Sequence, residues 1–504
     1  MNVPPSASVL AQFGFPASHL AAPILQFSEL DYQQFQDAPA VFAEFADEPW
    51  AMLLDSAQAQ HPNSRYDILV RRPHATIRVE HSHSYIEFHH ANDSATNHTL
   101  EIATTALNPL QLLNLWMPTL TPTKIPDPFS DLPFIGGFVG LFGYDLGRTL
   151  EQLPSTALAD IHIADLAVGL YFHALIIDHQ EQRAVAIHPA GEPMLFAHAT
   201  TPAIKPTITN FQLTSPWHSN LSAQQYQQGI AKVHEYLRAG DCYQINLAQR
   251  FSASYVGSPW HAYQALRSAN QAPFSAFLQI PNGSILSVSP ERFLQTSNTG
   301  QVSTRPIKGT RPRRQNAAED QLQIEQLQSS AKDQAENLMI VDLLRNDISR
   351  VCAAGSVSVP ELFKIESFNA VHHLVSTVTG QLAPNETPFS LLAAAFPGGS
   401  ITGAPKIRAM EIIEELEPHR RSAYCGAIGY FSCHGRSDTS ITIRTLVCSE
   451  QRIHCWAGGG IVIDSEASAE YQETFDKVAR ILPVLTALNA PSEQPTSDTI
   501  KQRV

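Results

Sequence analysis

Strand-like runs and helical segments follow one another in this chain without the strict alternation that a doubly wound sheet requires. Over the first 200 residues, apolar runs such as 52–54, 67–70, 134–141 and 166–177 are separated by Pro, Gly and Asn, which is typical of buried strands. The last run is interrupted by His173 but is still expected to form one buried strand. The chain is therefore predicted to form a large α+β fold.

The composition changes after a stretch rich in Pro, Thr and Ser at 200–219, which indicates a connection between two parts. We expect an N-terminal region over residues 1–205 and a catalytic domain over residues 215–485. The last segment, 486–504, is polar and contains proline, so it is predicted to be a flexible tail.

Helical patterns appear after the connection. Ser222 and Gln225 have the spacing of a capping box, apolar residues then recur at helical spacing, and Gly240 supplies a stop signal. Two further helices are expected over 317–346 and 467–482.

The chain is acidic, with 33 Lys and Arg against 47 Asp and Glu and a net charge of −14. A field of this sign repels nucleic acid, so no nucleic-acid partner is expected. A site for an anionic substrate would have to concentrate its cationic side chains locally.

The six cysteines show neither a CxxC pair nor the spacing of zinc ligands. We interpret them as buried thiols of a protein in the reducing cytoplasm. The first residues lack the basic start and apolar run of a signal peptide, and no run approaches the roughly 18 apolar residues of a membrane span. A cytoplasmic protein without a membrane partner is therefore predicted.

Acidic residues are paired at helical spacing in both long helical patterns. Glu470, Glu473 and Lys477 share one face of the second pattern, and Asp333 and Glu336 share one face of the first. Such faces are ordinarily solvated. If the two faces met, their carboxylates would suit a hard cation such as Mg²⁺, which prefers oxygen ligands.

Two glycine-rich segments are compatible with a bound anion, because glycine lets backbone N–H groups approach a ligand closely. One is 456–461, which contains Gly458, Gly459 and Gly460, and the other is 396–406. The alternative is that a run of glycines simply forms a turn. The nucleotide-binding patterns GxGxxG after a first strand and GxxxxGK[ST] are absent.

Glu291 and Lys308 stand at the ends of two strand-like runs, 17 residues apart, so a hairpin would bring them together. Arg305 and Arg311 flank the lysine, and like charges lower the pKa of an amine and favour its nucleophilic form. A nearby glutamate could act as general acid or base. The alternative is a pair of surface charges in a basic loop.

Seven segments together resemble the chorismate-utilising enzymes, the family of anthranilate synthase component I, aminodeoxychorismate synthase component I, isochorismate synthase and salicylate synthase. They are Asp241–Leu247, Ser289–Arg292, Arg305–Thr310, Ala335–Asp347, His372–Leu374, Gly399–Lys406 and Glu470–Thr474. The resemblance is strong over 222–482, and 53–57 and 137–144 are similar to the aminating branch. It implies two facing antiparallel sheets flanked by helices, with the active site in a cleft between two subdomains.

The resemblance also implies roles for single residues. Glu336, Glu473 and Glu470 would hold Mg²⁺ on the ring carboxylate of the substrate, chorismate. The residues that match substrate-contacting positions are Gln244, His373, Ser400, Tyr424, Arg444, Gly458, Gly459, Gly460 and Lys477. Arg444, Lys477 and the metal ion would then supply the local cations that a dianionic substrate needs in an acidic chain.

Two positions discriminate within the family. Isochorismate and salicylate synthases resemble one another in carrying a water-activating lysine at the position of Gln244, and glutamine has no titratable base. Anthranilate synthases typically carry alanine at the position of Lys308. Lysine there resembles the aminodeoxychorismate synthases, in which it attacks ring carbon 2 and expels the 4-hydroxyl while Glu291 handles the proton. Ammonia then attacks carbon 4 and displaces the lysine.

The resemblance therefore implies an enzyme of the transaminase class that converts chorismate and ammonia to 4-amino-4-deoxychorismate, on the route to p-aminobenzoate and folate. No segment resembles a fused glutamine amidotransferase, so a separate subunit is expected to supply ammonia from glutamine. The alternatives are anthranilate synthase component I and a non-catalytic chorismate-binding paralogue.

A second ligand site is implied in the N-terminal part of the fold. Ser56 and the segment 270–275, which contains Pro273, Phe274 and Ser275, resemble the tryptophan-binding pocket of the aminating members. The alternative is that both segments are plain sheet edges.

Overall fold

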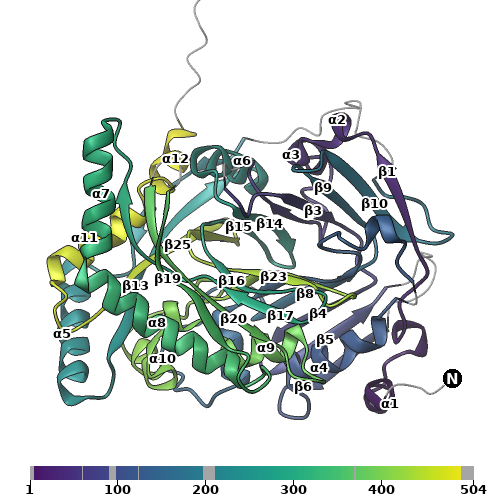
Figure 1. Ribbon diagram of the computed structural model, residues 1–504, viewed down its shortest axis with the longest axis horizontal. Coiled ribbons are helices and arrows are strands. Elements are labelled where there is room, and N and C mark those ends of the chain that lie inside the picture. The colour runs from purple at the N-terminus through teal and green to yellow at the C-terminus, as the bar shows by residue number, and fades with distance from the viewer. Residues whose placement is uncertain are drawn as a thin grey trace, which may run out of the picture.

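Two large antiparallel sheets form the molecule, and helices flank them (Figure 1). The computed structural model describes residues 5–58, 61–89, 98–122, 124–196, 210–367 and 371–489. Part of the predicted connection, and the predicted tail beyond residue 489, lie outside these described residues. The predicted α+β class with two facing antiparallel sheets is confirmed.

The first sheet has 13 strands. Its order is β1 (Leu25–Leu30), β10 (Arg183–Pro189), β9 (Ala174–Asp178), β3 (Tyr66–Val70), β2 (Met52–Asp55), β14 (Phe274–Ile280), β15 (Gly283–Ser289), β24 (Thr445–Ser449), β25 (Arg452–Ile461), β13 (Gln244–Val256) and β11 (Gln212–Leu213), with β12 (His218–Ser219) and β21 (Gly403–Ala404) also on β13.

The second sheet has 12 strands. Its order is β18 (Ile307–Pro312), β20 (Val371–Gln381), β17 (Gln301–Thr304), β16 (Arg292–Thr296), β23 (Ser437–Ile441), β22 (Ala427–Ser432), β7 (Gly137–Phe142), β8 (Leu166–Tyr171), β4 (Ala75–Glu80), β5 (His83–Phe88) and β6 (His98–Ala103), with β19 (Ser358–Ser367) also on β20.

Each sheet combines strands from both sides of the predicted connection. In the first sheet β2 pairs with β14, and in the second β7 pairs with β22. The N-terminal region therefore extends the two sheets of the catalytic region. The boundaries 1–205 and 215–485 stay predictions.

The prediction of one strand over 166–177 is wrong. β8 belongs to the second sheet and β9 to the first, so the chain crosses between the sheets at Phe172 and His173. Both strands are buried along their whole length. Because a strand covered on both faces is continuously apolar, the hydrophobic pattern does not reveal the crossing.

The helices lie on the outer faces and ends of the sheets (Figure 1). They are α1 (Pro5–Gln12), α2 (Tyr32–Phe35), α3 (Ala38–Phe42), α4 (Pro109–Trp116), α5 (Ala223–Ala239), α6 (Pro259–Asn270), α7 (Ala317–Ser329), α8 (Ala331–Ser349), α9 (Pro388–Ala395), α10 (Lys406–Leu416), α11 (Ala467–Val478) and α12 (Leu482–Ala487). Short 3-10 turns are η1 (Ala17–His19), η2 (Met117–Leu120), η3 (Asp127–Phe129), η4 (Tyr144–Thr149) and η5 (Gly399–Ile401).

The predicted start and end of α5 are confirmed. Ser222 and Gln225 form the capping box, in which the Ser222 side chain accepts from the Gln225 backbone N–H. At the other end, Gly240 adopts a left-handed conformation with φ 79°, which glycine takes without the steric cost of a Cβ atom.

The two longer predicted helices are each wrong in length. The pattern over 317–346 is divided into α7 and α8, because Ser330 is extended (ψ 100°) and its hydroxyl accepts from the Asp333 N–H as the cap of α8. The pattern over 467–482 ends at Val478, and a separate short helix, α12, begins at Leu482.

Aromatic side chains fix several helices on the two sheets. Phe389 of α9 stacks on Phe431 of β22 with ring centroids 4.1 Å apart, and Trp116 of α4 meets Phe138 of β7 edge-on. α4 and α9 are thereby fixed on the second sheet. On the first sheet, Trp260 of α6 packs edge-on against a phenylalanine of β14.

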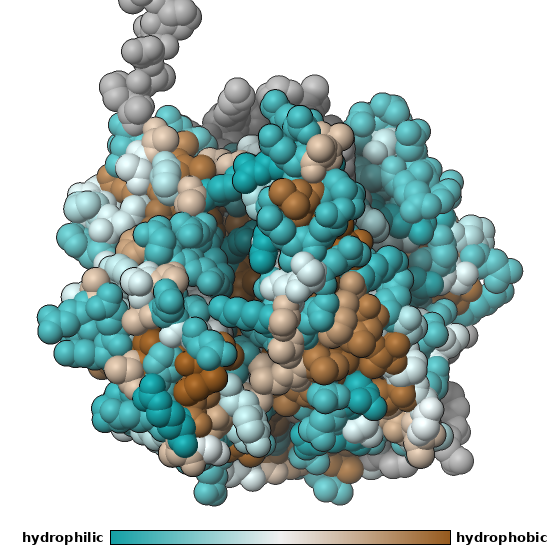
Figure 2. Space-filling view, turned by 60° about the vertical axis from the view of Figure 1, so that its left-hand side comes forward, coloured by the Kyte–Doolittle hydropathy of each residue, from teal (hydrophilic) through white to brown (hydrophobic). Residues whose placement is uncertain are grey.

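The surface is predominantly polar. Figure 2 turns the side of the molecule that carries α5, α7 and α11 forward and shows hydrophilic side chains over most of it, with separate hydrophobic patches. In the described part of the chain, no helix combines the length and apolar character that crossing a membrane requires. All six cysteines are buried, and none of them forms a disulfide within the described residues.

Candidate active site between the two sheets

A cavity of about 660 Å³ opens between one end of the first sheet and one end of the second. Strands β13 and β25 contribute to one wall, β18 and β20 to another, and helices α8 and α11 also line it. The predicted site residues on its wall are Glu291, Lys308, Glu336, His373, Ser400, Tyr424, Arg444, Gly458, Gly459, Gly460, Glu470, Glu473 and Lys477. One cavity thus brings together every predicted catalytic, metal and substrate residue except Gln244.

The predicted hairpin joins Glu291 to Lys308. β16 pairs with β17 in antiparallel register, and the chain then turns into β18, which carries Lys308. The Ile307 N–H points to a carboxylate oxygen of Glu291 at 3.5 Å. Burial raises the pKa of Glu291, and Lys308 only partly offsets this shift. A carboxyl with a raised pKa is suited to general acid–base work.

Lys308 forms an ion pair with Glu336 of α8, with Nζ 2.9 Å from Oε1. Its ammonium group also donates to the carbonyl of Ser400 at 3.3 Å. Burial lowers the pKa of Lys308, but the carboxylates of Glu336, Glu291 and Glu473, with Glu336 foremost, together outweigh burial and raise it. In this state the lysine is therefore a protonated amine.

The expectation that Arg305 and Arg311 lower the pKa of Lys308 is wrong. Arg305 pairs with Glu366 of β19, and Arg311 pairs with Asp333 at 3.0 Å. Each guanidinium charge is balanced by its own carboxylate, so neither arginine offsets the effect of Glu336 on the lysine.

Three carboxylates lie on the cavity wall beside the glycine strand. The position that a Cβ would take at Gly459 lies 3.0 Å from Glu470 Oε2 and 3.5 Å from Glu473 Oε1, and the corresponding position at Gly460 lies 3.2 Å from Glu336 Oε1. Glu473 pairs with Lys477 at 2.7 Å. Burial raises the pKa of Glu470, and Glu473 adds to the shift.

This donor set suits Mg²⁺ in its chemistry, because hard carboxylate oxygens are the ligands that magnesium takes, commonly one or two with waters and substrate oxygens. Among the described residues, however, no group of three or more His, Cys, Asp or Glu side chains is drawn together tightly enough to hold a metal ion. Lys308 and Lys477 instead neutralise Glu336 and Glu473. A metal ion would therefore have to replace at least one lysine.

The glycine run is a strand and not a turn. Gly458, Gly459 and Gly460 belong to β25 and pair with β13. None of the three needs a left-handed backbone; a Cβ at Gly458 would lie 2.4 Å from the Leu247 carbonyl oxygen, and one at Gly460 would lie 2.3 Å from Gln244 Nε2. Glycine is therefore required for space and gives the cavity a wall of bare backbone.

That backbone has an open edge. β24 pairs with β25 only as far as Cys455, so within the described residues the segment 456–461 has a strand neighbour on one side alone. Arg444, the residue before β24, has a left-handed backbone with φ 50° and turns the chain away at this point. Its guanidinium makes no hydrogen bond or ion pair with any other described residue, which leaves it available for an anion in the cavity.

Neutral groups complete the wall. His373 is hydrogen bonded through Nδ1 to Thr310 Oγ1 at 2.9 Å, and burial together with Arg444 lowers its pKa to about 4. It is therefore uncharged near pH 7. Tyr424 stacks on Trp456 with centroids 5.9 Å apart and planes within 5°, which provides an apolar surface for a ring.

Gln244 stands behind the wall and does not line the cavity. Its side chain is fully buried, and within the described residues neither of its amide atoms has a hydrogen-bond partner. Asn246, two residues further along β13, does line the cavity and was missed in the sequence. The alternation of a strand could have found it, because residues i and i+2 lie on the same face.

A second cavity, of about 80 Å³, lies between the two sheets near β2 and β14. Pro273, Phe274 and Ser275 line it, and so does Asp55, but Ser56 does not. Residues of β22 and β23 close its other side. The segment 270–275 thus faces a cavity, while Ser56 takes part in the polar network beside it.

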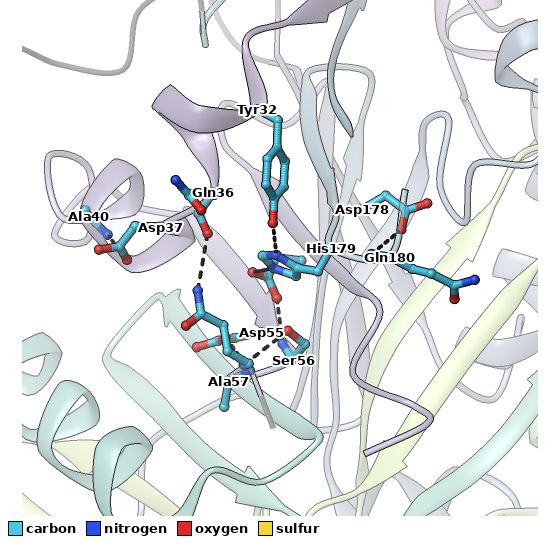
Figure 3. A network of polar contacts seen from close by, with 12 residues as sticks. Tyr32, Gln36, Asp37, Ala40, Asp55, Ser56, Ala57, Asp178, His179 and Gln180 are labelled. Carbon is cyan, nitrogen blue, oxygen red and sulfur yellow. Dashed lines mark hydrogen bonds and ion pairs between the residues drawn. The ribbon is translucent and has the colours of Figure 1, made fainter. Parts of the chain in front are cut away.

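Figure 3 shows part of that network, in which Tyr32 contacts His179 and the Ala57 N–H donates to Asp55. Asp55 binds Arg267 at 2.5 Å and accepts from Tyr263 at 2.8 Å, and burial raises its pKa. Asp67 accepts from the Ser56 N–H at 2.7 Å and contacts His179 Nε2 at 2.6 Å. The strand end at Asp55 is thereby fixed.

The chain matches the model of a family described as chorismate binding enzyme over residues 51–483. The chain belongs to this family. It is 51% identical to aminodeoxychorismate synthase component 1 of Klebsiella aerogenes, over 88% of this chain and 95% of the relative. It is 52% identical to the protein of the same name from Escherichia coli strain K12, over 88% of this chain and 95% of the relative. Anthranilate synthase component 1 of Thermus thermophilus is 38% identical to this chain, over 71% of this chain and 79% of the relative.

Solved structures of the family have the same fold. Anthranilate synthase component I of Streptococcus pneumoniae superposes with a TM-score of 0.71 at 31% identity, over 83% of this chain and 92% of that one. The menaquinone-specific isochorismate synthase of Escherichia coli superposes with a TM-score of 0.66 at 17% identity, over 95% of this chain and 98% of that one. At that identity the second likeness shows the fold alone.

Proposed function

We propose that this chain is the chorismate-aminating component of an aminodeoxychorismate synthase. It converts chorismate and ammonia to 4-amino-4-deoxychorismate and water and leaves the pyruvyl group on the ring, a transfer of the transaminase class. The observation that carries the proposal is Lys308, whose amine stands in the cavity beside Glu291, Glu336 and the unpaired Arg444. The identity of 51–53% with relatives of that name supports it.

The cavity suits a dianion with an apolar ring. Arg444, Lys477 and the open backbone of Gly458–Gly460 supply positive charge and N–H groups for carboxylates. Tyr424 and Trp456 offer a flat apolar surface beside them. Cations are thus concentrated in one place on a chain whose net charge is −14.

Lys308 and Glu291 divide the chemistry between them. The neutral amine of Lys308 attacks carbon 2. The two conjugated ring double bonds shift, from C1=C2 to C1=C6 and from C5=C6 to C4=C5, and the C4–O bond breaks while Glu291 protonates the departing hydroxyl to water. Ammonia then bonds to carbon 4, the two double bonds shift back, the electron pair of the C2–N bond returns to Lys308, and the Glu291 carboxylate takes the proton from the new ammonium. Both groups return to their starting states.

Glu336, Glu470 and Glu473 would hold Mg²⁺. The ion would neutralise a substrate carboxylate when bound. Metal binding by Glu336 would also affect Lys308. The Glu336 carboxylate raises the pKa of the lysine, so its amine becomes nucleophilic only when Glu336 no longer pairs with it.

A separate glutamine amidotransferase subunit supplies the ammonia. The sequence contains no segment with the features of that enzyme, and the relatives named component 1 support a second component. The chain alone is expected to use ammonium salts but not glutamine. The six buried, unpaired thiols support a reducing, cytoplasmic location.

Tryptophan is the proposed occupant of the cavity at Pro273–Ser275. Pro273, Phe274 and Tyr430 give the cavity an apolar lining that suits an aromatic side chain. Because its volume is about 80 Å³, the cavity would have to widen to admit tryptophan. A thermal shift with L-tryptophan tests this: stabilisation is expected for the wild type and is expected to be lost in Phe274→Ala.

Product identification tests the function as a whole. Purified chain, chorismate, Mg²⁺ and ammonium should give 4-amino-4-deoxychorismate without release of pyruvate. Anthranilate with stoichiometric pyruvate would make the chain an anthranilate synthase component I. Binding of chorismate without turnover would identify a non-catalytic paralogue.

A further inference from the structure

Two of the segments that carry the family resemblance end outside the catalytic cavity. Segment 335–347 ends on Asp347 of α8, and segment 399–406 ends on Lys406, the first residue of α10. Both residues line a separate cavity of about 710 Å³ that α4, α8, α9 and α10 border, and neither lines the catalytic cavity. The proposed chemistry therefore leaves these two residues without a role.

The ammonium group of Lys406 joins three parts of the chain. Its Nζ donates to the Asp347 carboxylate at 2.8 Å and to the Ala395 carbonyl at 2.8 Å. Ala395 is the last residue of α9, so this one ammonium closes the base of the glycine-rich segment between α9 and α10. Asp347 anchors the same group to α8.

The pair of Asp347 and Lys406 is buried in surroundings that oppose its charges. The Asp347 side chain is 4% exposed and the Lys406 side chain 15%. Burial raises the pKa of Asp347 and lowers the pKa of Lys406, and each partner only partly offsets the shift of the other. Because a buried ion pair is a weak source of stability, this one is better explained by the arrangement that it fixes.

The face of α8 that carries Asp347 also carries Glu336. Glu336, Leu343 and Asp347 are separated by about two and three helical turns, so they share one face. Between the two carboxylates, the Leu343 side chain occupies the space that a Cβ of Gly399 would take. This face of the helix therefore packs directly on the glycine-rich segment.

Lys308 binds the same two elements at the other end of that face. Its Nζ pairs with Glu336 of α8 at 2.9 Å and donates to the Ser400 carbonyl of the segment at 3.3 Å. Glu336 and Asp347 are about 16 Å apart along the helix axis. Two lysines thus join α8 to the segment, Lys308 inside the catalytic cavity and Lys406 outside it.

We propose that Asp347 and Lys406 are a positioning pair for the catalytic lysine. They hold α8 against the base of the glycine-rich segment, so that Glu336 and the Ser400 carbonyl reach Lys308 together. The pair touches neither substrate nor reacting atoms and acts through these two groups. The role rests on the proposed function, in which Lys308 is the nucleophile.

The double variant Asp347→Asn/Lys406→Met tests the pair by kinetics. It removes both charges at nearly constant size, so no buried charge is left unpaired and the chain should stay folded. A shift of about 1 Å in a reacting group can cost about a hundredfold in rate, so kcat with ammonium salts is expected to fall at least about tenfold. The KM for chorismate should stay within about twofold, because Arg444 and Tyr424 lie on other elements.

Crystal structures of the wild type and the double variant, both without ligand, give a readout that does not depend on turnover. The distance from Lys308 Nζ to Glu336 Oε1 is expected to be longer in the variant by about 1 Å or more. A pair that served stability alone would lower the melting temperature and leave both this distance and kcat unchanged.

Asp342→Asn is the matched control, because it removes an exposed carboxylate from the same helix. Its kcat is expected to stay within about twofold of the wild type. If the double variant does not fold, Asp347→Glu carries the test. It keeps both charges and lengthens the link by one methylene, so a folded protein with a lower kcat and an unchanged KM for chorismate is expected.

The outcomes separate the pair from the function. Wild-type kcat in the double variant, or in Asp347→Glu where the double variant does not fold, overturns the positioning role. An unchanged distance between Lys308 and Glu336 overturns it as well. A wild type that gives no aminated product overturns the proposed function alone, because the two crystal structures still decide whether the pair sets that distance.

Discussion

Lys308 Nζ and Glu336 Oε1 lie 2.9 Å apart and join the second sheet to helix α8 across the catalytic cavity. The pair holds the proposed nucleophile in its protonated form and occupies a carboxylate that the metal ion would need. One ion pair therefore both keeps the lysine protonated and neutralises Glu336.

Removal of the Lys308 amine is expected to stop 4-amino-4-deoxychorismate formation. In Lys308→Ala, ammonia can attack carbon 2 directly, so any residual product should be shifted towards amination at that carbon. Incubation of the wild type with chorismate and Mg²⁺, without ammonia, should add a chorismate-derived mass to the peptide that contains Lys308. Lys232→Ala, on the exposed face of α5, is the control. A Lys308→Ala enzyme that forms the 4-amino product at close to the original rate would contradict the mechanism.

Loss of a single carboxylate is expected to abolish magnesium-dependent turnover without unfolding the chain. Glu336→Gln and Glu473→Gln keep the shape of the side chain and remove its charge, so activity should fall at least about a hundredfold. Both variants should remain folded, but the melting temperature of Glu336→Gln should fall, because the buried Lys308 loses its partner. Asp333→Asn should affect magnesium less, because Asp333 is bound to Arg311. Isothermal titration with Mg²⁺ and chorismate separates the variants, and full activity of either glutamine variant would count against the assignment.

The reactivity of Lys308 is expected to depend on pH in a direction that Glu336 sets. Burial alone lowers the pKa of the lysine, but Glu336 raises it above its ordinary value, so the neutral amine forms only at high pH. Glu336→Gln should lower that pKa, and an amine-modifying reagent should then label Lys308 faster at pH 8. The pair's contribution to stability is fully present below the unfolded pKa of about 10.4 and is lost as pH rises through the raised pKa. Equal labelling of both proteins would disprove this.

The bare glycine strand is expected not to tolerate a methyl group. In Gly460→Ala the new Cβ would lie 2.3 Å from Gln244 Nε2, so the buried amide must move, at a cost of about 1–3 kcal/mol. Gly458→Ala should destabilise the fold more, because its Cβ would meet the backbone of β13 at 2.4 Å. Gly229→Ala, inside α5, is the control: alanine favours the helix, and the new Cβ would meet only the end of the Leu247 side chain, at 3.2 Å, so a change within about 1 kcal/mol is expected. Urea unfolding measures all three, and a Gly458→Ala protein of wild-type stability would contradict the close approach of the strands.

The buried pair of Asp55 and Arg267 is expected to matter for stability more than any exposed pair. The carboxylate of Asp55 is completely buried, so Asp55→Ala leaves Arg267 and Tyr263 without their partner, at a cost of about 3–5 kcal/mol. Glu235→Ala breaks an exposed pair with Lys232 and should cost less than about 1 kcal/mol. Chemical denaturation distinguishes the two, and equal losses would argue against the role of burial.

Local signals in the sequence predicted much of the structure. The capping box of α5 depends on two residues three positions apart, Ser222 and Gln225. The hairpin between Glu291 and Lys308 depends on strands that follow one another directly in the chain. Both features could therefore be found in the sequence. The division of 317–346 at Ser330 could also have been found, because a serine pair is a weak helix former and a good cap.

Other features depend on contacts that sequence separation hides. The chain changes sheet at His173, but the strands on either side are both buried on two faces. Their apolar sequences therefore look like one continuous strand. The pKa of Lys308 was predicted from Arg305 and Arg311, its neighbours in sequence, but it is set by Glu336, its neighbour in space. Asn246 stood inside a recognised segment, and only its unpaired oxygen distinguished it from the residues around it.

The hairpin that carries Glu291 and Lys308 has an evolutionary consequence. Its strands are held in the second sheet by β23 and β20, and Lys308 lies in an irregularity of β18 whose flanking residues, Ile307 and Thr310, pair with β20. On the proposed mechanism, exchange of that one side chain would change the ring carbon that is aminated, while the walls that recognise the ring stay as they are. Paralogues with different products could thus have diverged from a common ancestor by point mutation, without passing through a protein that no longer folded.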